Sequence, residues 1–152
     1  MKRSFPGSSF AALAALALVG CGGSASSGPD ARETTAYTGI ASGEAITLSG
    51  TEPFWNAQIE SGTMRYSTME DQEGTTFPVE RFAGNNGLAF SGRTPGENAS
   101  GISVDVAVTP GECSDGMSDR SYPFVATLVV GSETRRGCAY TDRQPFVGPD
   151  RP

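Results

Sequence analysis

The chain has 152 residues, 11 of them basic and 17 acidic, for a formal net charge of −6, and it contains no histidine. A chain of this length predicts one folded domain. The lack of histidine excludes Ser-His-Asp and Cys-His catalysis and histidine metal sites, and the acidic balance argues against nucleic acid as a partner.

The N-terminus combines a short basic start with an apolar run. Lys2 and Arg3 precede an apolar segment over residues 10–19. Such a segment is too short to cross a bilayer core, which needs about 20 residues. The arrangement is typical of a secretory signal peptide.

Residues 18–21 read LVGC and resemble the lipobox of bacterial lipoproteins. The resemblance implies that residues 1–20 are a signal peptide cut before Cys21, and that this cysteine is acylated, with palmitate-type chains holding the protein to a membrane. The mature chain would carry nine arginines, no lysine and 17 acidic residues, a formal charge of −8. Gly22 replaces the aspartate common in inner-membrane lipoproteins, which favours the outer membrane with the domain facing the periplasm.

Composition divides the remaining chain into three parts. Residues 21–43 are rich in Gly, Ser, Ala and Thr and predict a flexible tether after the lipidated cysteine. Residues 141–152 are rich in proline and predict a frayed tail. The folded domain is therefore expected over 44–140.

Eight short segments in that domain have the character of β-strands, and turn signals separate them. No stretch is amphipathic over enough residues to predict a helix. The pattern predicts an all-β domain, a small antiparallel barrel or sandwich with its interior mostly filled by side chains. The expected strands are 45–50, 54–59, 63–68, 75–82, 88–92, 102–108, 124–130 and 134–140.

Some positions within these strands carry more specific expectations. Ile102 is expected to share the buried face of its strand with three valines, and a turn is expected at 109–111. Phe82 is expected to point inward with Phe77. Pro78 between them indicates an edge position or a bulge.

Cys113 and Cys138 are left as a pair once Cys21 is assigned to lipid. In an oxidising compartment an even pair predicts a disulfide. It would close a loop of about 25 residues and stabilise the fold by roughly 3–4 kcal/mol. A metal site is the alternative, and it lacks histidine and the CxxC spacing. We therefore expect no metal and no other cofactor.

The segment GTEPFW at 50–55 opens the second strand. Gly50 is expected to adopt a backbone conformation closed to other residues. In one interpretation Trp55 fills the core, its indole N–H bonds to a buried acceptor, and Phe54 covers one end of the barrel. In the other, Glu52, Phe54 and Trp55 form a ligand platform at the barrel rim.

The segment CSDGMSDRSYPF at 113–124 gathers polar residues around a tight turn at Asp115-Gly116. One interpretation is structural: Ser114, Ser118 and Asp119 bond to nearby backbone, and Arg120 pairs with a carboxylate. Another is an exposed protein-recognition loop held by the disulfide. A Ca²⁺ site at Asp115 and Asp119 has too few ligands. A glycosidase pair lacks an evident separation across a cleft, and a serine nucleophile lacks a base.

Together these motifs and a final Gly137-Cys138 resemble a largely uncharacterised family of bacterial envelope proteins, described as lipoproteins or predicted membrane proteins. Its members share G-x-E-P-F-W and, later, C-S-D-G-M-S-D-x-x-Y-P. The likeness spans roughly 44–140. It implies a fold and a location rather than an activity, and it implies that the two motifs meet in space.

The expected function is that of a non-catalytic cell-envelope lipoprotein, attached to the membrane by lipid, whose barrel binds a protein or glycan. The alternative is an inhibitor of a lysozyme-like hydrolase, by analogy with small lipoprotein barrels that insert a loop into lysozyme. An enzyme using carboxylates ranks last, because the mature chain would lack histidine and lysine. The expected binding face comprises Glu52, Phe54, Trp55, Asp115, Asp119, Arg120 and Tyr122.

Overall fold

The computed structural model of the protein describes residues 35–96 and 100–149. The predicted signal peptide and lipidation site, residues 1–20 and Cys21, lie outside the described residues, as does most of the predicted tether. Within the described ranges, no helix has the length and hydrophobicity to span a membrane.

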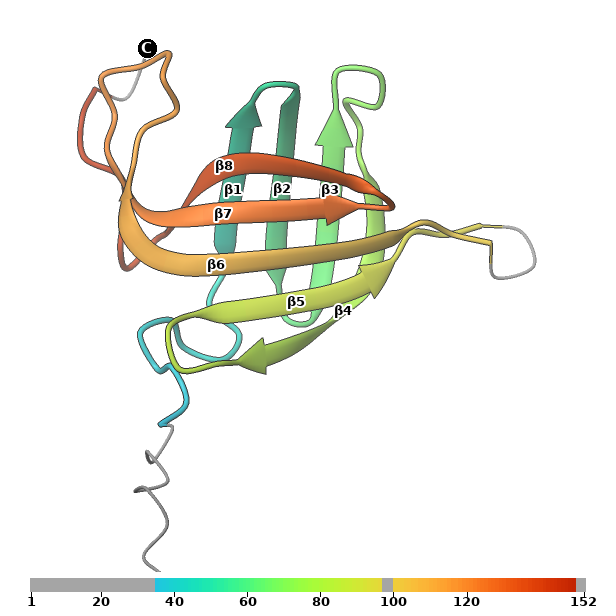
Figure 1. Cartoon of the computed structure of the whole chain (residues 1–152), viewed down its shortest axis with the longest axis horizontal. Helices are drawn as coiled ribbons and strands as arrows, with labels where there is room; N and C mark the ends of the chain where they lie inside the picture. The colour runs from blue at the N-terminus through green and yellow to red at the C-terminus, as the bar shows by residue number, and fades with distance from the viewer. Residues whose placement is uncertain (1–34, 97–99, 150–152) are drawn as a thin grey trace, which may run out of the picture. The chain divides into compact units, whose positions relative to one another are not determined.

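Eight antiparallel strands form a closed barrel in which each strand pairs with its neighbours in sequence and β1 pairs with β8. The predicted all-β class is confirmed, and the chain adopts the barrel rather than the sandwich. Figure 1 shows β5–β8 lying across β1–β3. The strands are β1 (Ile46–Thr51), β2 (Phe54–Glu60), β3 (Thr63–Thr68), β4 (Thr75–Ala83), β5 (Leu88–Arg93), β6 (Ser103–Cys113), β7 (Tyr122–Val130) and β8 (Glu133–Thr141).

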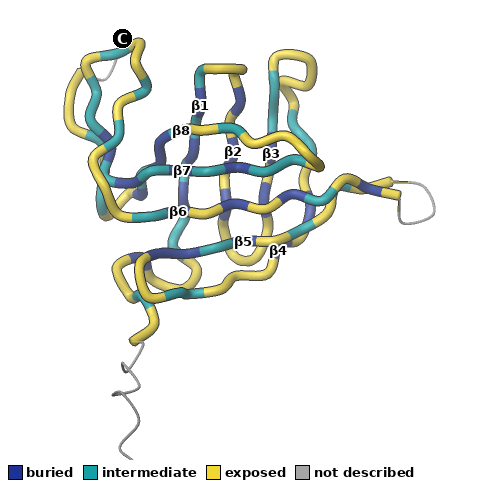
Figure 2. Tube along the Cα trace, viewed as in Figure 1, coloured by how far each residue is buried: buried dark blue, intermediate teal, exposed yellow. Residues whose placement is uncertain are grey.

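The barrel interior follows from the two-residue period of the strands. β2 buries every second residue, and the side chains between them are exposed. Leu48 of β1 lies opposite Ala57 of β2 and Ala139 of β8, and all three are buried. Figure 2 shows the resulting alternation of buried and exposed residues along the strands. The interior is filled by side chains, and the largest of those less than 2% exposed belong to Trp55, Phe124, Ile40, Ile46, Leu48, Met64 and Leu128.

Trp55 lies in the core and rests against two glycines. Its indole N–H donates to the Arg136 carbonyl oxygen at 3.2 Å. A Cβ atom at Gly50 would lie 2.0 Å from the indole nitrogen, and one at Gly137 would lie 2.7 Å from the ring. Gly50 has no positive φ. The expected special backbone conformation is therefore wrong, and Gly50 is needed because the indole lies where any side chain would be.

Three finer expectations about the strands are wrong. β6 continues through the predicted turn at 109–111 and ends at Cys113, with an irregular register opposite β7 that accommodates Pro110. Ile102 is 53% exposed because it precedes β6. Phe82 is 69% exposed because Phe77 and Val79 define the inward face of β4, and residue 82 falls on the opposite face. For Pro78 the expected edge position holds locally: it pairs with Thr63 of β3 and, among the described residues, with none of β5, because β4 passes from pairing with β3 to pairing with β5 after it.

Packing extends past both ends of the range 44–140. Ile40 is 1% exposed in the core, and Tyr37 packs against the core and donates its N–H to the Gly84 carbonyl oxygen at 2.7 Å. After β8, Phe146 packs against Tyr122 and Tyr140. These are isolated apolar residues without periodicity, so the sequence pattern gave no sign of them.

Charged side chains lie near both ends of the barrel. Before β1, the largely buried carboxylate of Glu44 accepts the Ala41 N–H at 3.0 Å. A hydrogen bond from the Thr141 hydroxyl lowers the pKa of Glu44, although burial opposes this.

On β8, Arg135 faces inward opposite Leu128 and donates to the Tyr66 hydroxyl at 2.6 Å and to Glu133 at 2.7 Å. Burial raises the pKa of Tyr66.

Candidate functional site

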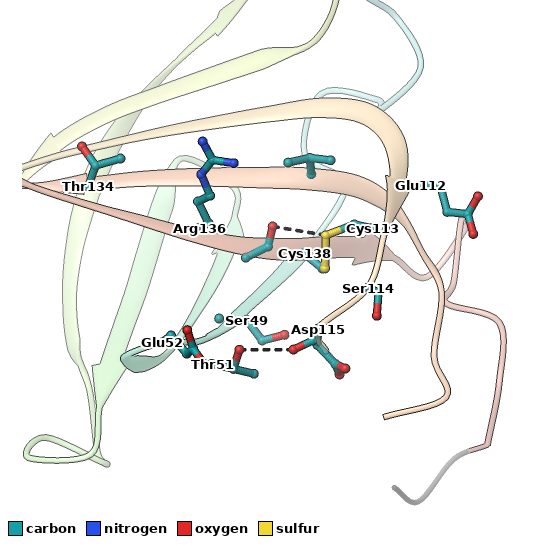
Figure 3. A pocket seen from close by; sticks show the side chains of 13 residues that line it. Ser49, Thr51, Glu52, Glu112, Cys113, Ser114, Asp115, Thr134, Arg136 and Cys138 are labelled. Atoms are coloured by element: carbon teal, nitrogen blue, oxygen red, sulfur yellow. Dashed lines mark hydrogen bonds between the residues drawn. A yellow bond between two sulfur atoms is a disulfide. The ribbon is translucent and has the colours of Figure 1, made fainter. Parts of the chain in front are cut away.

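A hollow of about 570 Å³ opens on the outside of the barrel, between the two sequence motifs. Figure 3 shows Thr51 and Glu52 on one side of it and Ser114 and Asp115 on the other, with β8 alongside. The turn before β2 contains a cis peptide bond at Glu52-Pro53. The hollow is lined by Ser49, Gly50, Thr51, Glu52, Glu112, Cys113, Ser114, Asp115, Val125, Thr134, Arg136, Gly137 and Cys138.

Thr51 joins the two motifs directly. Its hydroxyl donates to the Asp115 carbonyl oxygen at 3.2 Å, across 64 residues of sequence. Thr51 is the last residue of β1, and the two-residue period places it on the outer face with Ser49. The segment after β6 is therefore bonded to the outer surface of the barrel near the β1–β2 turn.

Asp115 organises the segment that follows β6. Its carboxylate accepts the N–H groups of Met117 and Ser118 at 3.0 and 2.8 Å, the Ser118 hydroxyl at 2.7 Å and the Tyr122 hydroxyl at 3.1 Å. Burial raises the pKa of Asp115, but these four hydrogen bonds outweigh it and lower the pKa to about 2. The carboxylate is therefore ionised at neutral pH and unsuited to act as a general acid.

The predicted disulfide joins Cys113 to Cys138, with Cα atoms 5.6 Å apart, and this pairing is confirmed. Cys113 ends β6 and Cys138 lies in β8, so the bond links two strands that both pair with β7. Cys138 is opposite Ser49 and Val125, on the outer face. It is 1% exposed, yet neither cysteine belongs to the core cluster. The disulfide thus holds the end of β6 over the outside of the barrel.

A C-terminal strap, residues 143–149, supports the same segment. Ser121 and Val147 exchange backbone hydrogen bonds of 2.9 and 2.8 Å. Phe146 packs against Tyr122 and Tyr140, at ring-centroid distances of 5.7 and 5.2 Å. Arg120 lies over the Phe146 ring at 4.4 Å and donates to the Pro149 carbonyl oxygen at 2.8 Å. The strap therefore holds the C-terminal end of segment 113–122, and the disulfide holds its N-terminal end.

The structure separates the residues of the expected binding face. Glu52 and Asp115 line the hollow, whereas Trp55 is in the core, as the first interpretation of its motif expected. Phe54 is 47% exposed on the outer face of β2.

The remaining three residues of that face lie beyond the hollow. Asp119 is exposed, Arg120 turns toward the strap, and Tyr122 is buried beneath Asp115. The carbonyl oxygen of Pro149 and the ring of Phe146 both contact Arg120.

Sequence reasoning missed several residues around the hollow, among them Thr51, Glu112, Thr134 and Arg136. Thr134 and Arg136 lie four and two residues before Cys138 on the same strand, so the two-residue period could have placed them beside the disulfide. Phe146 lies outside the strands, so this periodicity could not have placed it.

The side chains around the hollow carry hydroxyl, carboxylate and guanidinium groups. The described residues include no group of three His, Cys, Asp or Glu side chains that could hold a metal ion. Asp115 has its carboxylate committed to four internal donors. What the arrangement offers outward is hydroxyl groups, the Arg136 side chain and the carboxylates of Glu52 and Glu112.

Comparisons of the chain with protein-family models, with curated proteins and with solved structures find no significant match.

Proposed function

We propose that the chain is a non-catalytic bacterial cell-envelope lipoprotein whose barrel is a binding module. One observation carries the binding role: the polar residues of the second motif bond to one another on the outer surface and hold an exposed segment in one conformation. A preordered surface segment favours binding, because less conformational entropy is lost on association. The filled interior leaves the surface as the place where a partner would bind.

The anchor is proposed from the sequence, at Cys21 behind the predicted signal peptide, and family membership is proposed from the two motifs. Labelled palmitate supplied to a bacterial host expressing the full chain should be incorporated into the protein. Cys21→Ser should remove the label and release the protein from the outer-membrane fraction. Equal labelling of both forms would contradict the anchor.

The binding role is tested with a soluble form that begins after Cys21 and keeps the C-terminus, because Phe146 is part of the support. Immobilised in its oxidised form, it should retain one discrete component of an envelope extract. The double variant Cys113→Ser/Cys138→Ser should retain much less of that component. Equal retention by the two forms would remove the argument from a preordered segment.

An inhibitor of a lysozyme-like hydrolase is the second candidate. The observation that favours it is an ordered exposed segment on an acidic chain, since acidic groups would suit a basic enzyme electrostatically. The soluble form in micromolar excess should then lower the rate of cell-wall lysis by lysozyme. An unchanged rate would reject this candidate and leave the first one standing.

A further inference from the structure

The tip of the segment after β6 presents an apolar side chain to solvent. Met117 is 67% exposed. Gly116 beside it has φ +71° and no heavy atom within 4 Å of where a Cβ would be, so the turn stands clear of the barrel. On the paired strap, Val147 is 75% exposed. Two exposed apolar side chains thus lie on segments that are bonded to each other.

The backbone on both sides of Met117 is fixed although its side chain is not packed. The Met117 N–H itself donates to Asp115, and the next N–H does the same. The disulfide at Cys113 holds the segment before the tip, and the Ser121–Val147 bridge holds it after the tip. A side chain presented on such a backbone can bind with little further ordering.

This order is not required by the barrel core. The core cluster is built from the strands and Ile40, and it includes no residue of 113–122. The disulfide, the aromatic contacts of Phe146 and the Arg120 cation–π contact all lie outside that cluster. They stabilise the presentation of the segment.

The charges flanking the tip are acidic. Glu112 and Asp119 are exposed, and Glu52 lies across the hollow. The cation of the segment, Arg120, is directed toward Phe146 and Pro149. A complementary surface would therefore have basic groups around an apolar socket.

We infer that residues 114–119 form a recognition loop that inserts Met117 into an apolar socket, rimmed by basic side chains, on a different protein. The inference rests on the proposed binding function and narrows it to one loop and one class of partner. A methionine side chain suits such a socket because it is flexible and polarizable.

Site-specific photocrosslinking with the full chain in intact cells tests this. A photoreactive residue is placed at Met117 or, as the matched control, at Phe82, which is 69% exposed on β4. The expected result is one crosslinked protein from position 117 and not from position 82. Crosslinking from position 82 alone, or equally from both, would overturn the loop assignment and leave the binding function intact.

The remaining outcomes of the crosslinking experiment also test the inference. Crosslinking at neither position would overturn both the loop assignment and the proposed binding function. A crosslink to a second copy of the chain, or to lipid, would overturn the assigned class of partner.

The captured protein is then titrated with purified variants. Met117→Ser should weaken binding about tenfold or more through faster dissociation, and Met117→Leu should restore most of the affinity. The pair Glu112→Gln/Asp119→Asn should slow association several-fold and flatten its dependence on salt. Unchanged affinity in Met117→Ser would overturn the inference even if the crosslink formed.

Discussion

The barrel interior and the surface segment 113–122 are ordered by different means. The interior depends on a repeated pattern: each strand contributes apolar side chains at every second residue, and many such residues share the burial. The segment depends on single atoms: one carboxylate accepts four hydrogen bonds, and one disulfide and one aromatic ring support it. The interior is thus shared by the whole barrel, whereas the segment depends on a few groups outside the core cluster, so single substitutions should affect the two regions differently.

The largest effect is expected in the core. Trp55→Ala would remove the largest buried side chain and leave a cavity between Gly50 and Gly137. We expect a loss of about 4 kcal/mol in the free energy of unfolding. Denaturant titration measures this. A loss below about 1 kcal/mol would mean that the indole is not part of the interior.

The disulfide comes next. Cys113→Ser is expected to lower the free energy of unfolding by about 3 kcal/mol, through the loop of 25 residues that the bond closes. Cys138→Ser should lower it by about 1 kcal/mol more, because its hydroxyl would be buried where Cys138 is 1% exposed. In both variants the far-ultraviolet dichroism of the barrel should persist in water. Loss of the β signal would show that the two regions are not separable.

A glycine substitution tests where the two regions meet. In Gly137→Ala the new Cβ would lie 2.2 Å from the Ser49 carbonyl oxygen and against the Trp55 ring. We expect a loss of about 2 kcal/mol from overpacking. Gly111→Ala is the matched control, since its Cβ would meet only Val125 at 3.6 Å, and its midpoint of denaturation should barely move. Similar midpoints of denaturation for the two variants would contradict the close packing of the Trp55 indole against Gly137.

The smallest effect concerns Asp115 and pH. Its pKa of about 2 in the folded chain lies below the ordinary value of 3.8, so its stabilising contribution is full above about pH 4 and is lost as the pH falls toward 2. After allowance for solvent screening we expect about 1 kcal/mol. Asp115→Asn should be less stable than the unmodified chain at pH 7, and the difference should shrink toward pH 2. If the difference in stability between the two proteins did not change with pH, the ionised carboxylate of Asp115 would not be the form that accepts the hydrogen bonds of the segment.

Sequence pattern predicted the barrel well and the outer segment only in part. All eight strands were expected because alternation is a property of many residues, and an error at Phe82 or Ile102 changes only one of them. β6 was expected to end too early because Pro110 and Gly111 read as a turn, whereas an irregular register carries the strand through them. The strap was missed because its contacts join residues far apart in sequence, such as Arg120 and Phe146, and no local pattern encodes them.

The pairing of β1 with β8 closes the barrel and so affects how copies of this protein can associate through their strand edges. A sheet with an open side offers a row of unpaired N–H and C=O groups on which a neighbouring copy can add a strand. In this barrel every strand pairs with a neighbour on each side, although β4 changes partner after Pro78 and the end of β6 pairs with β7 alone. Copies held close together would therefore offer one another few unpaired strand edges, which favours each copy remaining a separate unit.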